Sequence, residues 1–168
     1  NPDANLATHT SSLTQEEIGT AHSLPDRLIG MHFFNPVPVL PLVEIVYSDA
    51  SDSTFVDRAM YVCGALKKLP VRCRSAPGFL VNRELLPYVF KAVEAVLDGA
   101  DPDRIDQALV TFGMPMGPIE LCDQVGIDVC LGAGQVTGIS PAVAARFLSL
   151  IHISEPTRQA EISYAVFW

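Results

Sequence analysis

The sequence LIGMHFFNPVPVLPLVEIV, residues 28–46, decides the fold of this chain. Two apolar runs of strand character, 28–34 and 42–47, flank a loop rich in proline, which has no N–H to donate to a central strand. His32 lies near the end of the first run and Glu44 lies inside the second. A histidine leaving one strand and a carboxylate arriving on the next is the arrangement that a general base and its orienting partner need.

Neither residue carries that interpretation alone. A histidine on an apolar strand is usually a hydrogen-bonded core residue. A carboxylate inside the run LVEIV needs a partner to be tolerated there. Placed side by side, the glutamate satisfies its own charge and fixes the histidine tautomer, so that the other ring nitrogen can accept a proton. We therefore predict that His32 and Glu44 are in contact.

The composition is that of a globular protein: 168 residues, 49% hydrophobic and 18% charged, enough for one domain or two small ones. The formal net charge of −8 argues against nucleic acid and anionic membranes as partners. No apolar run reaches the roughly 20 residues of a membrane span, and no signal-peptide pattern opens the chain. The four cysteines lack metal-ligand spacing, which predicts core thiols in a reducing compartment and no metal site. Because no methionine precedes Asn1, we expect a fragment of a longer protein.

The amino-terminal elements are short. Residues 5–8 lead into a hydroxyl cluster that contains Ser11, which is typical of the carboxyl edge of a parallel sheet, where α/β proteins bind ligands. The same cluster could equally be a loop that caps the next helix. The capping box T-x-x-E at 14–17 predicts that this helix runs to about Ala21.

The rest of the amino-terminal part alternates helix and strand. Residues 52–68 follow a helical period with Ser51 or Ser53 as the cap, and residues 69–73 form a strand. The expected buried stripe of that helix is Phe55, Ala59, Cys63 and Leu66. Alternation of this kind predicts an α/β sheet, and the strand 28–34, apolar on both faces, favours a parallel one.

After about residue 75 the sequence predicts helices only, over 79–98, from Asp101-Pro102, over 118–125 and from Gly126. The stripes expected to be buried are Leu80, Leu85, Val89, Val93 and Leu97 in the first helix and Ile105, Ala108, Leu109 and Phe112 in the second. The predicted domains are therefore 1–74, which is α/β, and 75–147, which is all-helical.

The last residues break the pattern. LSLIHISEPTRQAEISYAVFW, residues 148–168, continues no helical period and resembles the translated read-through of a transposase-based sequencing-library adapter. We expect a non-native tail and exclude it from fold reasoning. The alternative is a genuine carboxyl-terminal helix.

Four separate motifs, in order, point to one family. GMHFFNPV, PLVEIV, APGFLVNR and FGMPMGPIELCDQVGID together resemble the L-3-hydroxyacyl-CoA dehydrogenase family. Pro41 and the motif GADPDRID resemble the dehydrogenase part of the multifunctional fatty-acid β-oxidation proteins more closely than the small stand-alone enzymes. The resemblance implies the carboxyl-terminal part of a Rossmann-like NAD domain, followed by an all-α domain that helps to bind substrate and dimerises.

The resemblance also implies roles for five residues. His32 corresponds to the catalytic base and Glu44 to its orienting carboxylate. Ser11 and Asn35 correspond to contacts with the substrate oxygen and the nicotinamide end of NAD, and Asn82 to a contact with the substrate carbonyl. The implied reaction is NAD-dependent oxidation of L-3-hydroxyacyl-CoA to 3-oxoacyl-CoA.

The implied setting is the bacterial cytoplasm or the mitochondrial matrix. The implied partners are an acyl-CoA substrate and a second copy of the chain, or a thiolase-containing complex if the protein is multifunctional.

Two departures from the family pattern affect these expectations. His9 stands where the family motif has asparagine, beside the expected cofactor position. The glycine-rich G-x-G-x-x-G turn is not among these residues, so we expect the fragment to be inactive alone. Two alternatives remain: another two-domain hydroxy-acid dehydrogenase, and a non-catalytic structural relative.

Overall fold

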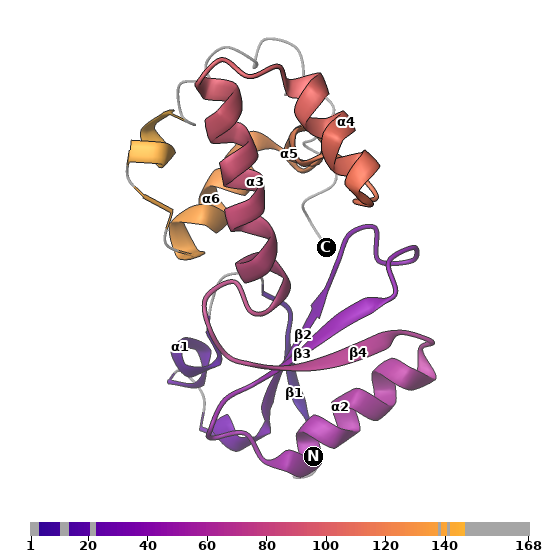
Figure 1. The fold of residues 1–168 in the computed structure, drawn as a ribbon. Coiled ribbons are helices and arrows are strands. Elements are labelled where there is room, and N and C mark those ends of the chain that lie inside the picture. The colour runs from indigo at the N-terminus through magenta and orange to yellow at the C-terminus, as the bar shows by residue number, and fades with distance from the viewer. Residues whose placement is uncertain (1–3, 11–13, 21–22, 138, 141, 147–168) are drawn as a thin grey trace, which may run out of the picture. The chain divides into compact units, whose positions relative to one another are not determined.

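A computed structural model of the chain describes residues 4–10, 14–20, 23–137, 139–140 and 142–146. The chain divides into two compact units, residues 1–83 and 84–168 (Figure 1). Ser11 and the expected adapter tail, 148–168, lie outside the described residues.

The first unit is built on a sheet of four strands in the order β1-β2-β3-β4 (Figure 1). The strands are β1 (Leu6–Thr8), β2 (Leu28–Phe33), β3 (Leu42–Tyr47) and β4 (Leu69–Arg74). The outer pairs are parallel, but β2 and β3 are antiparallel, so the expectation of a parallel sheet is wrong at this position. The reason is the length of the loop 34–41, since a parallel crossover needs a dozen or more residues.

Helix α2 (Ser53–Ala65) packs on one face of the sheet (Figure 1). Side chains alternate along a strand, so Ile29, Val43 and Ile45 face this helix, and Gly30, His32 and Glu44 face the other way. The buried core on the helix side is Ile29, Val43, Ile45, Val56, Ala59 and Cys63.

Two details of α2 differ from expectation. Its cap is Asp52, whose carboxylate accepts from the Thr54 N–H at 2.8 Å, and neither Ser51 nor Ser53. Leu66 is 59% exposed, because the helix ends at Ala65 and Leu66 falls past the buried stripe. The stripe is completed by Val56 instead.

The short elements before β2 are α1 (Gln15–Gly19) and a 3-10 turn, η1 (Pro25–Arg27). The predicted capping box is confirmed: the Thr14 hydroxyl accepts from the Glu17 N–H, and the Glu17 carboxylate accepts from the Thr14 N–H. Helix α1 ends at Gly19, before the expected Ala21.

The helices that follow are α3 (Val81–Leu97), α4 (Pro102–Phe112), α5 (Pro118–Val125) and α6 (Ile127–Thr137). The predicted starts at Asp101-Pro102 and Pro118 are confirmed, and Pro87 lies inside α3. The expected buried stripe of α4 is wrong: none of its described side chains is fully buried, and Phe112 is 82% exposed. Leu80 is also exposed, since it precedes α3 and does not lie on its apolar face.

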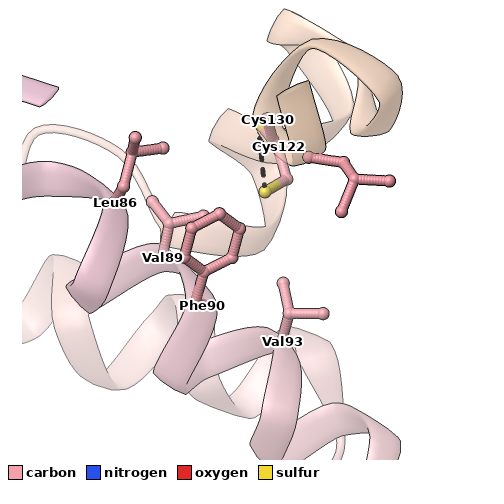
Figure 2. Close-up of a cluster of buried hydrophobic side chains, with 7 residues drawn as sticks. Leu86, Val89, Phe90, Val93, Cys122 and Cys130 are labelled. Carbon is pink, nitrogen blue, oxygen red and sulfur yellow. Dashed lines mark hydrogen bonds between the residues drawn. The ribbon is translucent and has the colours of Figure 1, made fainter. Parts of the chain in front are cut away.

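The core of the second unit joins three helices. Figure 2 shows Leu86, Val89, Phe90 and Val93 of α3 gathered against Cys122 of α5 and Cys130 of α6. The two sulfur atoms are 3.6 Å apart. All four cysteines are free and buried, which confirms the prediction of core thiols. Among the described residues, no helix is long and apolar enough to span a bilayer, and no three His, Cys, Asp or Glu side chains gather as metal ligands would.

Candidate active site

The turn between β2 and β3 places His32 directly opposite Glu44 in the sheet. Both side chains are buried, with 6% of His32 and none of Glu44 exposed. His32 Nδ1 lies 2.6 Å from Glu44 Oε2. Because an ionised carboxylate can only accept, Nδ1 is the donor in this contact, and in the neutral form of the ring this tautomer leaves the lone pair on Nε2.

The second oxygen of the carboxylate is held by backbone amides. Glu44 Oε1 accepts from the Leu80 N–H at 2.9 Å and from the Val81 N–H at 2.8 Å, where α3 begins. Burial by itself would raise the pKa of Glu44, but hydrogen bonds from His32, Val81 and Leu80 outweigh burial and hold this pKa below its ordinary value. Glu44 is therefore a charged group at neutral pH, inside the protein.

Aromatic rings enclose the imidazole. The ring centroids of Phe34 and Phe79 lie 4.7 and 5.4 Å from that of His32, both in edge-on geometry, and His9 lies at 6.0 Å. Such contacts fix the plane of the ring, so the direction of Nε2 is set as well as its tautomer. Burial, together with the Glu44 charge, raises the pKa of the nearby Cys73 to about 12, so this thiol is no nucleophile.

The other expected site residues are Asn35, Asn82 and Ser11. Asn35 is exposed and follows β2, three residues after His32. Asn82 is half-buried in the first turn of α3, next to Val81, whose amide binds Glu44. Ser11 lies outside the described residues, so the geometry brings together His32 and Glu44 and leaves the roles of the other three as predictions.

Sequence reasoning missed three features of this site. The amides of Leu80 and Val81 carry no side-chain signature, and Phe79 looked like an ordinary helix residue. Gln15 was also missed: it is 2% exposed and, within the described part of the chain, its side-chain amide has no hydrogen-bond partner. It lies against Gly30, where an added Cβ would come within 2.6 Å of Gln15 Nε2.

The edge of the sheet next to the histidine suits a nucleotide cofactor. Strands β1 and β2 are parallel, with Thr8 opposite Gly30, and β2 continues to Phe33. The carboxyl ends of both strands therefore point to the same end of the sheet, where His9 follows β1 and Asn35 follows β2. Ligands of α/β proteins bind outside the carboxyl ends of parallel strands. A free imidazole nitrogen beside such an edge can remove a proton from a hydroxyl bound there.

Comparison with known families covers almost the whole described chain. The family model for the 3-hydroxyacyl-CoA dehydrogenase NAD binding domain matches residues 1–76, and that for the carboxyl-terminal domain matches residues 78–147. A 3-hydroxybutyryl-CoA dehydrogenase from Clostridioides difficile is 42% identical over 131 residues, 77% of this chain and 47% of the relative. The fatty acid oxidation complex subunit alpha of Acinetobacter baylyi is 39% identical over 132 residues, 78% of this chain and 18% of the relative.

Solved structures give the same result. FadB2 of M. tuberculosis matches with a TM-score of 0.82 and 36% identity, over 89% of this chain and 56% of that one. The (S)-3-hydroxybutyryl-CoA dehydrogenase PaaH1 of Ralstonia eutropha matches with a TM-score of 0.84 and 31% identity, over 91% and 56%. The chain thus spans about half the length of these stand-alone relatives and a smaller share of the multifunctional ones.

Proposed function

This chain belongs to the 3-hydroxyacyl-CoA dehydrogenase family, and from that membership we propose that the protein oxidises L-3-hydroxyacyl-CoA to 3-oxoacyl-CoA in fatty-acid β-oxidation. The observation that carries the proposal is the buried contact of 2.6 Å between His32 and Glu44. Matches to 3-hydroxybutyryl-CoA dehydrogenases and to fatty acid oxidation proteins support the substrate class.

In the proposed reaction His32 is the base. Its Nε2 takes the proton of the substrate hydroxyl as hydride leaves the same carbon and the carbon–oxygen double bond forms. NAD+ supplies the hydride acceptor when it is bound. The imidazolium that results is stabilised by Glu44, which is already ionised and 2.6 Å away. In the reverse direction the same nitrogen returns the proton.

The remaining site residues would orient the substrate. We assign Ser11 and Asn35 to the substrate oxygen and the nicotinamide end of the cofactor, and Asn82 to the thioester carbonyl. The exposure of Asn35 beside the carboxyl edge of β2 and the position of Asn82 in the first turn of α3 support this assignment. Fixing the two reactants in line would supply part of the rate enhancement.

The domain limits and the cellular setting belong to the same proposal. Residues 1–74 form the end of the NAD-binding domain, and residues 75–147 belong to the helical domain that binds substrate and dimerises. The cytoplasm is the proposed site for a bacterial protein and the mitochondrial matrix for a eukaryotic one. A thiolase-containing complex replaces the homodimer if the protein is multifunctional.

The test is NADH formation from 3-hydroxybutyryl-CoA and NAD+, measured on protein from the complete reading frame. We expect turnover in that protein and a fall of about 10²–10⁴-fold in kcat for His32→Ala, because general-base catalysis is worth that much. Unfolding curves of both proteins show whether the variant keeps its fold. An unchanged kcat would favour a non-catalytic relative, and turnover of free 3-hydroxybutyrate in place of its CoA ester would favour a different hydroxy-acid dehydrogenase.

A further inference from the structure

We propose that Phe79 is a positioning residue for the His32–Glu44 pair, an inference that rests on the proposed function of that pair. The observation behind it is that Phe79 contacts His32 and directly precedes the two residues whose amides bind Glu44. The Phe79 ring meets the His32 ring edge-on at 5.4 Å. Its backbone leads directly into the two amides, of Leu80 and Val81, that bind Glu44 Oε1.

The backbone at this point is unusual for a large side chain. Gly78 and Phe79 both have positive φ, +75° and +50°, in a turn closed by a hydrogen bond of 2.9 Å from the Phe79 N–H to the Ala76 carbonyl. Glycine adopts this left-handed conformation freely, whereas a bulky residue is strained in it. If the turn required only a backbone conformation, glycine would suit position 79 better than phenylalanine. The side chain must therefore contribute something that offsets the strain.

What the side chain contributes is anchorage. Phe79 is 3% exposed and packs with Val46 of β3 and Cys73 of β4 in a small core of its own. Val46 lies two residues after Glu44 on β3, and Cys73 of β4 is the partner of Val46. The side chains of Glu44, Val46 and Cys73 therefore share one face of the sheet. The ring is thus fixed to the same strand that carries Glu44.

The consequence is that the turn cannot move away from the carboxylate while the ring stays buried. The N–H groups of Leu80 and Val81 point at Glu44 Oε1 because Phe79 directs the chain there. Without them Glu44 would lose two of its three hydrogen bonds while remaining wholly buried. A less firmly held carboxylate would also orient His32 less well, and misplacement of about 1 Å can cost a hundredfold in rate.

The experiment compares Phe79→Gly and Phe79→Leu in the complete enzyme. Phe79→Gly removes the anchor and keeps the left-handed turn free of strain, and Phe79→Leu keeps part of the apolar bulk. Phe55→Leu is the matched control, because Phe55 packs in the core on the opposite face of the sheet. The measurements are kcat, KM, and hydrogen exchange of the Leu80 and Val81 amides.

We expect Phe79→Gly to lower kcat about tenfold or more with a smaller change in KM, since a positioning residue acts on the transition state. The two amides should exchange faster in the same variant, Phe79→Leu should recover part of both losses, and Phe55→Leu should show neither. Wild-type kcat and wild-type amide exchange in Phe79→Gly would overturn the proposal. If Phe79→Gly does not fold, the proposal is overturned by a Phe79→Leu variant that keeps wild-type kcat and wild-type exchange of the two amides.

The two proposals fail separately. A wild-type enzyme without dehydrogenase activity removes the proposed function, whereas the exchange rates of Leu80 and Val81 still report whether Phe79 holds the turn against Glu44.

Discussion

Glu44 shows at the scale of one residue how a charge is kept inside this protein. Its side chain is fully buried, which alone would favour the neutral acid. One imidazole and two backbone amides supply three hydrogen bonds to its two oxygens. Hydrogen bonds to a charged group are stronger than neutral ones, and here they outweigh the burial. At neutral pH the site thus holds an anion behind the imidazole, which is what an imidazolium needs during proton transfer.

A pH-dependent stability follows from that balance. The folded-state pKa of Glu44 lies below its ordinary value of 4.5, so the ionised carboxylate stabilises the fold above pH 4.5, and this contribution is lost as pH falls through the folded pKa. Glu44→Gln, which is nearly isosteric, has no such contribution. We expect wild type to exceed Glu44→Gln in free energy of unfolding near neutral pH, and the difference to shrink as pH falls below 4.5.

Urea unfolding of both proteins at a series of pH values measures this difference. The comparison at the lowest pH serves as the internal control, because protonated Glu44 in wild type and the glutamine in the variant are then both neutral. A difference that stays constant across the series would show that the carboxylate is not held in its charged form.

Sequence reasoning succeeded for this pair for a physical reason. His32 and Glu44 lie on adjacent strands joined by a short loop, so their contact is nearly local, and a carboxylate in an apolar strand demands a partner. The groups that complete the site are backbone amides from a segment far along the chain, and any residue has a backbone N–H. The left-handed conformation of Phe79 is not predictable from its residue type, since bulky residues rarely adopt it.

At the scale of elements, one carboxylate links two helices. Asp106 of α4 accepts hydrogen bonds from the Ile119 N–H at 2.9 Å and the Glu120 N–H at 2.8 Å, in the first turn of α5. The residue that precedes α5 is Gly117, which has no side chain to cap it. Asp106 therefore acts as the cap of a helix to which it does not belong, and it ties that helix to α4.

Removal of this cap should be costly. We expect Asp106→Ala to lower the free energy of unfolding by about 0.5–2 kcal/mol, the usual range for loss of a helix cap. Asp103→Ala, on the exposed side of the same helix, is the matched control and should cost less. Thermal or urea unfolding of both variants measures the two losses in free energy of unfolding. Equal losses would mean that the α5 amides find other partners when Asp106 is replaced.

Elements were predictable where their ends carry local signals. The Thr14 capping box and the Asp101-Pro102 start are encoded within a few residues, and both are confirmed. The antiparallel pairing of β2 and β3 is set by the short loop between them and not by their apolar content, which is why apolar content alone predicts it wrongly. The exposed stripe of α4 differs from expectation because a helical period shows which residues share a face, and not whether anything covers that face.

At the scale of the whole molecule, the two units have separate cores. The cluster under α2 and the small core around Phe79 use residues of the first unit, and the cluster of Figure 2 uses residues of the second. The division at residue 83 falls inside α3, close to its start at Val81. A defect in one core should therefore be felt first in its own unit.

Two glycines of α6 allow a matched test of this independence. A Cβ at Gly134 would come within 2.2 Å of the Phe90 ring, whereas a Cβ at Gly132 meets nothing within 4 Å. Alanine favours a helix over glycine by about 1 kcal/mol, so Gly132→Ala should stabilise the protein. At Gly134 the forced shift of a buried ring should outweigh that gain and cost about 1–3 kcal/mol.

Hydrogen exchange followed along the chain shows where that cost is felt. In Gly134→Ala we expect lower protection in α5, in α6 and in the part of α3 beyond residue 84, with unchanged protection in β2 and β3, because the affected core contains no residue of the sheet. Gly132→Ala should show no loss in either unit. Equal loss of protection in the sheet and the helices of Gly134→Ala would mean that the two cores unfold as one cooperative body, and would contradict the division of the chain at residue 83.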